Sequence, residues 1–131
     1  MKRKLIIFFM LIGFISITAQ SNKILYEQYK LDNGLSVILH KDNTNPIVHV
    51  SVLYHVGSKN EDPARTGFAH FFEHLMFEGS PNIKRGEYMK IIEAAGGGLN
   101  ANTSFDRTYY FQNLPSNQLE LGLYMESERM L

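Results

Sequence analysis

The feature that most constrains this chain is the stretch FAHFFEHLMFEGS, residues 68–80, whose polar and apolar residues separate on a helical wheel. At ~100° per residue, His70, Glu73 and His74 fall on one arc together with Phe77. A broad apolar arc lies opposite and consists of Phe68, Ala69, Phe71, Phe72, Leu75 and Met76. We therefore predict a helix over residues 67–78 with both histidines on the same side.

The two histidines have the spacing of metal ligands. His70 and His74 are one turn apart, about 6 Å along the axis, so both imidazoles can reach one ion. Histidine nitrogens bind zinc at ~2.0–2.1 Å, and Glu73 would border that ion without ligating it. A carboxylate there can take a proton from a water whose pKa the metal lowers towards ~7. HFFEH therefore predicts a Zn²⁺ site for hydrolysing peptide bonds. A solvated helix face and a pair of core histidines remain the alternatives at this point.

A catalytic zinc needs three protein ligands, and the third is not evident. Glu78 is a poor candidate because it lies eight residues from His70, or ~12 Å along the same helix. His40, His49 and His55 fall on predicted strands, where we expect surface or sheet-packing roles. Three further acidic residues belong to the last predicted helix without any pattern that points at the site: Glu120, Glu126 and Glu128.

Charge and cysteine content narrow the class of function. The chain has 131 residues, with 13 basic and 13 acidic side chains and a formal net charge of zero. This balance argues against a nucleic-acid partner, which normally requires a basic face. The chain has no cysteine, so disulfides and thiolate metal sites are excluded, and a metal must bind to His, Asp or Glu.

The first twenty residues, MKRKLIIFFMLIGFISITAQ, have the three parts of a secretory signal. Lys2, Arg3 and Lys4 precede a nearly unbroken apolar stretch over residues 5–17, which is shorter than the ~20 residues that span a bilayer. We predict a signal peptide over residues 1–19 and the N-terminal part of a metallopeptidase domain over residues 20–131. The protein would be exported, periplasmic or secreted, without a stable membrane anchor, and N-terminal sequencing of the mature protein would check this. An uncleaved anchor is the alternative.

The remaining residues predict an α+β domain of two layers. Asp32-Asn33-Gly34 predicts a hairpin, and alternation predicts a strand over 47–56 with Val48, Val50 and Val52 on one face. A helix is expected over 86–95, strands over 99–104 and 107–114, and a last helix capped by Asn117 and Glu120. We expect a mostly antiparallel sheet with helices packed on one face. Because the last helix is still running at Leu131, we expect the domain to be truncated at its C-terminus.

Two separated motifs resemble one enzyme family. RTGFAHFFEHLMFEGS contains H-x-x-E-H and resembles the inverted zinc motif of the pitrilysin/insulinase family of zinc metallopeptidases, which includes mitochondrial processing peptidase. GGGLNANTSFDRTYYFQNLP resembles the Gly-rich turn and following strand of the same family. The segments LDNGLSVILHKDN and HVGSKNE resemble its opening, so the likeness covers about residues 25–131.

This resemblance implies roles for particular residues. His70 and His74 would be zinc ligands, Glu73 the general base, and the third ligand a glutamate 70–80 residues beyond His74, past Leu131. Asn100, Ala101 and Thr103 would lie on an edge strand to which peptide substrates add. For Asn100, a turn residue after three glycines is the alternative. A second homologous half, downstream in the same chain or in a partner subunit, would complete the enzyme. A non-catalytic subunit or an inactive fragment of the same fold is the competing interpretation.

Overall fold

The computed structural model describes residues 23–131, so the predicted signal peptide lies outside the described residues. Contacts divide the chain after Asp42 into two units. The first contains a hairpin of β1 (Glu27–Lys30) and β2 (Ser36–Leu39), paired antiparallel with Glu27 opposite Leu39. Gly34 has φ +88° in its turn, and the Leu35 N–H donates to Asn33 Oδ1 at 3.1 Å. The predicted Asn-Gly hairpin is confirmed. No helix within residues 23–131 is long and apolar enough to cross a membrane.

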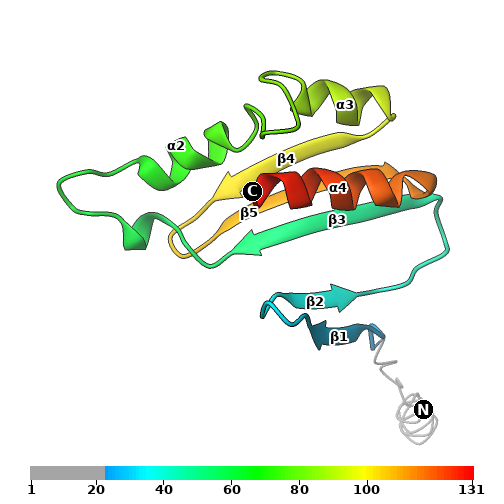
Figure 1. The fold of residues 1–131 in the computed structure, drawn as a ribbon. Coiled ribbons are helices and arrows are strands. Elements are labelled where there is room, and N and C mark those ends of the chain that lie inside the picture. Colours follow the sequence, from blue (N-terminus) through cyan, green and yellow to red (C-terminus); the bar gives the residue numbers. More distant parts are fainter. Residues whose placement is uncertain (1–22) are drawn as a thin grey trace, which may run out of the picture. The chain divides into compact units, whose positions relative to one another are not determined.

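The second unit is built on a three-stranded antiparallel sheet. Its strands are β3 (Ile47–Tyr54), β4 (Gly98–Thr103) and β5 (Thr108–Pro115), in the order β3-β5-β4 (Figure 1). Val50 is buried while His49 and Ser51 are exposed, as the alternation of β3 predicts. The central strand β5 turns its even-numbered residues inwards, where Tyr110, Gln112 and Leu114 are buried. Strand β4 is therefore an edge of the sheet.

Three helices pack against the inner face of this sheet, which confirms the predicted α+β two-layer architecture. They are α2 (Phe68–Leu75), α3 (Tyr88–Ala94) and α4 (Leu119–Arg129), and Figure 1 shows α4 running along β3 and β5. Two 3₁₀ turns, η1 (Ser58–Asn60) and η2 (Ser116–Gln118), lead into loop and helix. The core cluster combines residues of β5, α3, α4 and the loop before α3, namely Ile83, Tyr88, Ile92, Leu114 and Met125.

The predicted capping of the last helix by Asn117 is wrong. Asn117 lies inside η2, and α4 begins only after Gln118, which makes no side-chain cap hydrogen bond. Because the chain is already wound into a 3₁₀ turn before α4, Asn117 does not occupy the extended position that a capping side chain requires.

Glu128 of α4 fastens the loop between α2 and α3. It is buried, and its carboxylate accepts hydrogen bonds from the Ser80 hydroxyl at 2.6 Å and the Asn82 amide at 3.0 Å. The Ser80 hydroxyl first, and then Asn82, lower the pKa of Glu128 below its ordinary value of 4.5. The ionised carboxylate therefore stabilises the folded state.

We expect a pH-dependent difference in stability between the wild-type protein and Glu128→Gln. A lowered folded-state pKa contributes stability that is present above pH 4.5 and is lost as the pH falls through the folded value. The wild-type advantage should therefore be largest at pH 7 and shrink below pH 4.5, as measured by urea denaturation across this range. Glu120→Gln, at an exposed position of the same helix, is the matched control and should show little difference at any pH.

Candidate metal centre and peptide-binding edge

Helix α2 brings the two histidines together. Nε2 of His70 and Nε2 of His74 are 3.1 Å apart, and both side chains are exposed. Two nitrogen ligands at ~2.0–2.1 Å from one tetrahedral ion would be about 3.3 Å apart, so the observed spacing fits a shared metal. The predicted helix and the predicted convergence of these residues are confirmed. Neither histidine is a core residue.

Glu73 lies on the buried side of the same helix. It is only 8% exposed, and its carboxylate accepts a hydrogen bond from the Thr103 hydroxyl at the end of β4. A buried carboxylate needs such a donor, because it has lost hydrogen bonds to water. Within the polar arc, Glu73 thus faces the sheet and contacts the edge strand β4, while both histidines remain exposed.

The apolar arc of α2 is largely exposed. Phe68, Phe71, Phe72 and Leu75 keep between 41% and 56% of their surface exposed, whereas an apolar arc ordinarily marks the buried side of a helix. Phe77, on the polar arc, instead packs against the core cluster. The orientation of the helix is therefore opposite to the one that hydrophobicity alone favours.

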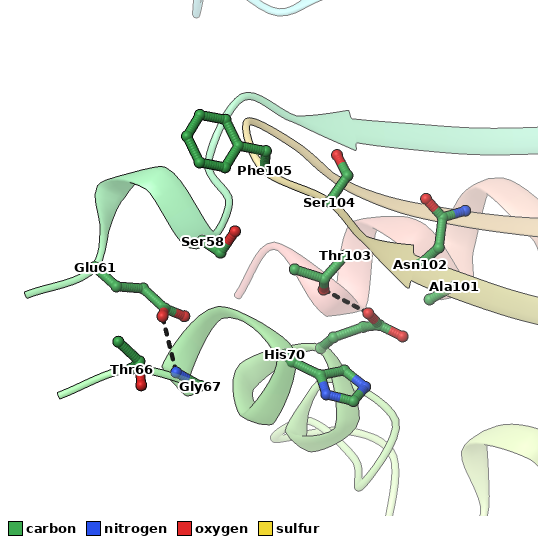
Figure 2. Close-up of a pocket in the computed structure, with 11 residues that line it drawn as sticks. Ser58, Glu61, Thr66, Gly67, His70, Ala101, Asn102, Thr103, Ser104 and Phe105 are labelled. Atoms are coloured by element: carbon green, nitrogen blue, oxygen red, sulfur yellow. Dashed lines mark hydrogen bonds between the residues drawn. The ribbon is translucent and has the colours of Figure 1, made fainter. Parts of the chain in front are cut away.

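A cavity of about 690 Å³ opens between α2, η1 and the end of β4. Figure 2 shows His70 on the helix side of this cavity and Ala101 and Thr103 on the strand side. Ser58, Glu61 and Phe105 line the remaining wall. His70 and the end of β4 therefore line the same cavity.

Glu61 is a structural part of this site that the sequence analysis missed. Its carboxylate accepts the Ala69 N–H at 2.7 Å and the Gly67 N–H at 2.8 Å, and these bonds, Ala69 first, lower the pKa of Glu61. The carboxylate thus satisfies the first turn of α2, whose N-cap Gly67 has no side chain. The sequence does contain an indication, because a glycine N-cap leaves the first-turn N–H groups to an acceptor from elsewhere.

The predicted substrate-binding residues lie on the edge strand as expected. Asn100, Ala101 and Thr103 all belong to β4, so the turn alternative for Asn100 is wrong. Their side chains differ in direction: Asn100 is exposed, whereas Ala101 and Thr103 are partly buried on the side of α2. The side-chain oxygen of Asn100 accepts the Ala101 N–H at 2.8 Å.

The described residues bring two histidines together, without a third metal-ligating side chain beside them. No group of three or more His, Asp or Glu side chains within residues 23–131 is placed to hold a metal ion. Glu78 pairs with Arg85 at 2.6 Å, and Glu126 pairs with Arg129 at 3.0 Å. His49 lies on the outer face of β3, where it contacts Asn113 and Tyr109.

Comparisons with known proteins all point to the same peptidase family. Residues 36–127 match the family described as insulinase (peptidase family M16). Zinc protease PqqE of Helicobacter pylori is 41% identical over 116 residues, which are 88% of this chain and 26% of that protein. Human insulin-degrading enzyme is 32% identical over 99 residues, 75% of this chain and 10% of that protein.

Two solved structures share the fold. The crystal structure of a protease from Helicobacter pylori has a TM-score of 0.78 and 41% identity, covering 81% of this chain and 26% of that chain. The crystal structure of pitrilysin has a TM-score of 0.76 at 24% identity, covering 85% of this chain and 12% of that chain. The chain thus spans about a quarter or less of the length of these proteins.

Proposed function

This chain belongs to the insulinase family, peptidase family M16, and we propose that it supplies the metal-binding part of a zinc endopeptidase. His70 and His74 would bind one Zn²⁺, and Glu73 would act as general base. The observation that carries the proposal is the 3.1 Å approach of the two Nε2 atoms, with the Glu73 carboxylate held on the same helix. Relatives at 41% and 36% identity are named as zinc proteases, which supports the same chemistry.

Each element of the site would have a separate task. Bound zinc would supply a Lewis acid that activates water and polarises the substrate carbonyl. Glu73, shielded from solvent by burial, would accept the proton of the attacking water and later return it to the leaving amine. The edge strand β4 would hold an extended peptide through backbone hydrogen bonds, which favour an extended shape over a particular sequence.

The zinc site would be completed from outside these 131 residues. Structural and catalytic zinc sites use at least three protein ligands, and the described residues place only the two histidines together. We propose that a further carboxylate of the complete protein is the third ligand and that a second homologous half closes over the peptide. A non-catalytic subunit or an inactive fragment of this fold is the second candidate, because the described residues bring together only two of the three ligands that a catalytic zinc needs.

Zinc content tests the proposed ligands directly. We expect the complete wild-type protein to retain about one zinc per site after dialysis, and His70→Ala and His74→Ala to lose it, because the remaining protein ligands hold zinc poorly. Elemental analysis of the dialysed proteins gives the stoichiometry. His49→Ala is the matched control, because this exposed histidine lies on the outer face of β3 and should leave the zinc content unchanged. Equal zinc in wild-type protein and His74→Ala would contradict the assignment.

A further inference from the structure

The side chain of Thr103 contacts Glu73, while its backbone belongs to the edge strand. Its hydroxyl donates to the carboxylate of Glu73, an interaction drawn as a dashed line from Thr103 in Figure 2. Thr103 is also the last residue of β4, the edge strand of the sheet. The same residue therefore contacts the proposed general base and belongs to the proposed peptide-binding edge.

The hydrogen-bond pattern of the hairpin places the backbone of Thr103 at the open edge. The Ser104 N–H donates to the Arg107 carbonyl at 2.8 Å, so residue 104 points its backbone towards β5. Along an antiparallel strand, the backbone N–H and C=O groups of successive residues point alternately to one side and the other. The N–H and C=O groups of residues 103 and 101 therefore point away from β5, towards the open edge. The Ala101 N–H is consistent with this direction, because it donates to the side-chain oxygen of Asn100 and not to β5.

Neighbouring contacts fix the position of Thr103. The Ser104 carbonyl accepts the Ser58 N–H at 3.1 Å, and the Phe105 carbonyl accepts the Lys59 N–H at 2.7 Å. Gly57 packs so closely that a Cβ there would meet the Ser104 carbonyl and the amides of Asp106 and Arg107. Because Thr103 is β-branched, its χ1 has few choices once this backbone is fixed. The direction of its hydroxyl is therefore set by the strand.

We propose that Thr103 is a positioning residue for Glu73: its hydroxyl holds the carboxylate in the orientation for catalysis, while its backbone helps to align the peptide. This inference rests on the proposed peptidase function. Thr103 would then do more than contact the substrate, because it would connect the peptide-binding edge to the general base. A peptide added to β4 is thereby aligned with the carboxylate by one residue.

The test compares three threonine substitutions in the complete protein, with internally quenched fluorescent peptides as substrate. Thr103→Val keeps the branched shape and removes the hydroxyl, and we expect kcat to fall about 10–100-fold with KM and zinc content unchanged. Thr103→Ser restores the hydroxyl and should recover most of kcat. Thr103→Ala is the second variant if valine disturbs folding, and it should behave as Thr103→Val does.

Thr108→Val is the matched control. Thr108 lies directly opposite Thr103 in the β4–β5 register, but its hydroxyl donates to the Val56 carbonyl at 3.0 Å and not to Glu73. This variant should lose stability while keeping kcat. An equal loss of kcat in Thr103→Val and Thr108→Val, or a rise in KM alone, would overturn the positioning role.

Glu73→Gln separates this inference from the proposed function. If Glu73→Gln is inactive and Thr103→Val cleaves at the wild-type rate, the inference fails and the peptidase assignment stands. If Glu73→Gln itself cleaves at the wild-type rate, the proposed function fails and the role of Thr103 with it.

Discussion

Replacing Arg129 with methionine should lower the free energy of unfolding by about 3–5 kcal/mol. The side chains of Arg129 and Glu126 are only 1% and 5% exposed, and Arg129 Nε lies 3.0 Å from Glu126 Oε2. Removing the guanidinium leaves the Glu126 carboxylate buried without its counter-charge, which costs more than the pair contributes when intact. Denaturation in urea or guanidinium chloride at pH 7 measures the loss.

The guanidinium of Arg129 also contacts three aromatic rings. Its guanidinium carbon lies 4.2 Å from the ring centroid of Tyr110, 4.6 Å from that of Tyr88 and 4.8 Å from that of Phe77. These cation–π contacts are desolvated, where they are strongest. Burial raises the pKa of Tyr110 to about 12, so this ring stays neutral beside the cation.

The same guanidinium ties α4 to the helix that carries the histidines. Its Nη1 donates to the Met76 carbonyl at 2.7 Å, and Met76 is the C-cap of α2. A cation at a helix C-terminus also interacts favourably with the helix dipole. The position of α2 over the sheet therefore depends on a residue 53 positions later in the chain.

Two controls separate this effect from the loss of any arginine. Arg129→Lys keeps the charge but loses the planar donors that reach both Glu126 and Met76, so we expect an intermediate loss. Arg85→Ala removes the ion pair between Arg85 and Glu78, in which the arginine side chain is 86% exposed. We expect this variant to lose only ~0–1 kcal/mol of unfolding free energy, as is typical of surface pairs. Equal effects of Arg129→Met and Arg85→Ala would contradict the buried-pair account.

Local patterns predicted the elements of the fold closely. The helix expected over residues 67–78 forms over Phe68–Leu75, and the one expected over 86–95 forms over Tyr88–Ala94. The two strands of the β4–β5 hairpin each differ from their expected range by one residue at either end. These features depend on hydrophobic periodicity and turn residues, which are properties of neighbours in sequence.

Long-range contacts could not be predicted in this way. The wheel of α2 separates the polar and apolar arcs correctly, but it does not say which arc faces the sheet. Glu73 faces the sheet because Thr103 supplies a hydrogen-bond donor for its carboxylate. Phe77 faces inwards because the rings of Tyr88 and Tyr110 pack against it. The roles of Glu61 and Arg129 likewise arise from contacts between separate segments, which no local pattern encodes.

Glu73→Gln should reduce peptide cleavage by the complete protein about 10²–10⁴-fold. Glutamine has the shape of glutamate and keeps an oxygen that can accept the Thr103 hydroxyl, so the packing beneath α2 should persist. An amide cannot take a proton from the attacking water, and this is the single property removed. Glu78→Gln is the matched control, because Glu78 is exposed, lies just beyond α2 and pairs with Arg85. It should cleave at close to the wild-type rate.

The most direct test of the zinc-peptidase account measures bound zinc and the rate of peptide cleavage on the same samples of wild-type protein and Glu73→Gln. We expect equal zinc in both proteins, because His70 and His74 remain in place in the variant, and cleavage about 10²–10⁴-fold slower in Glu73→Gln. Cleavage by Glu73→Gln at the wild-type rate would contradict the assignment of the general base, and the catalytic role of the HFFEH helix with it.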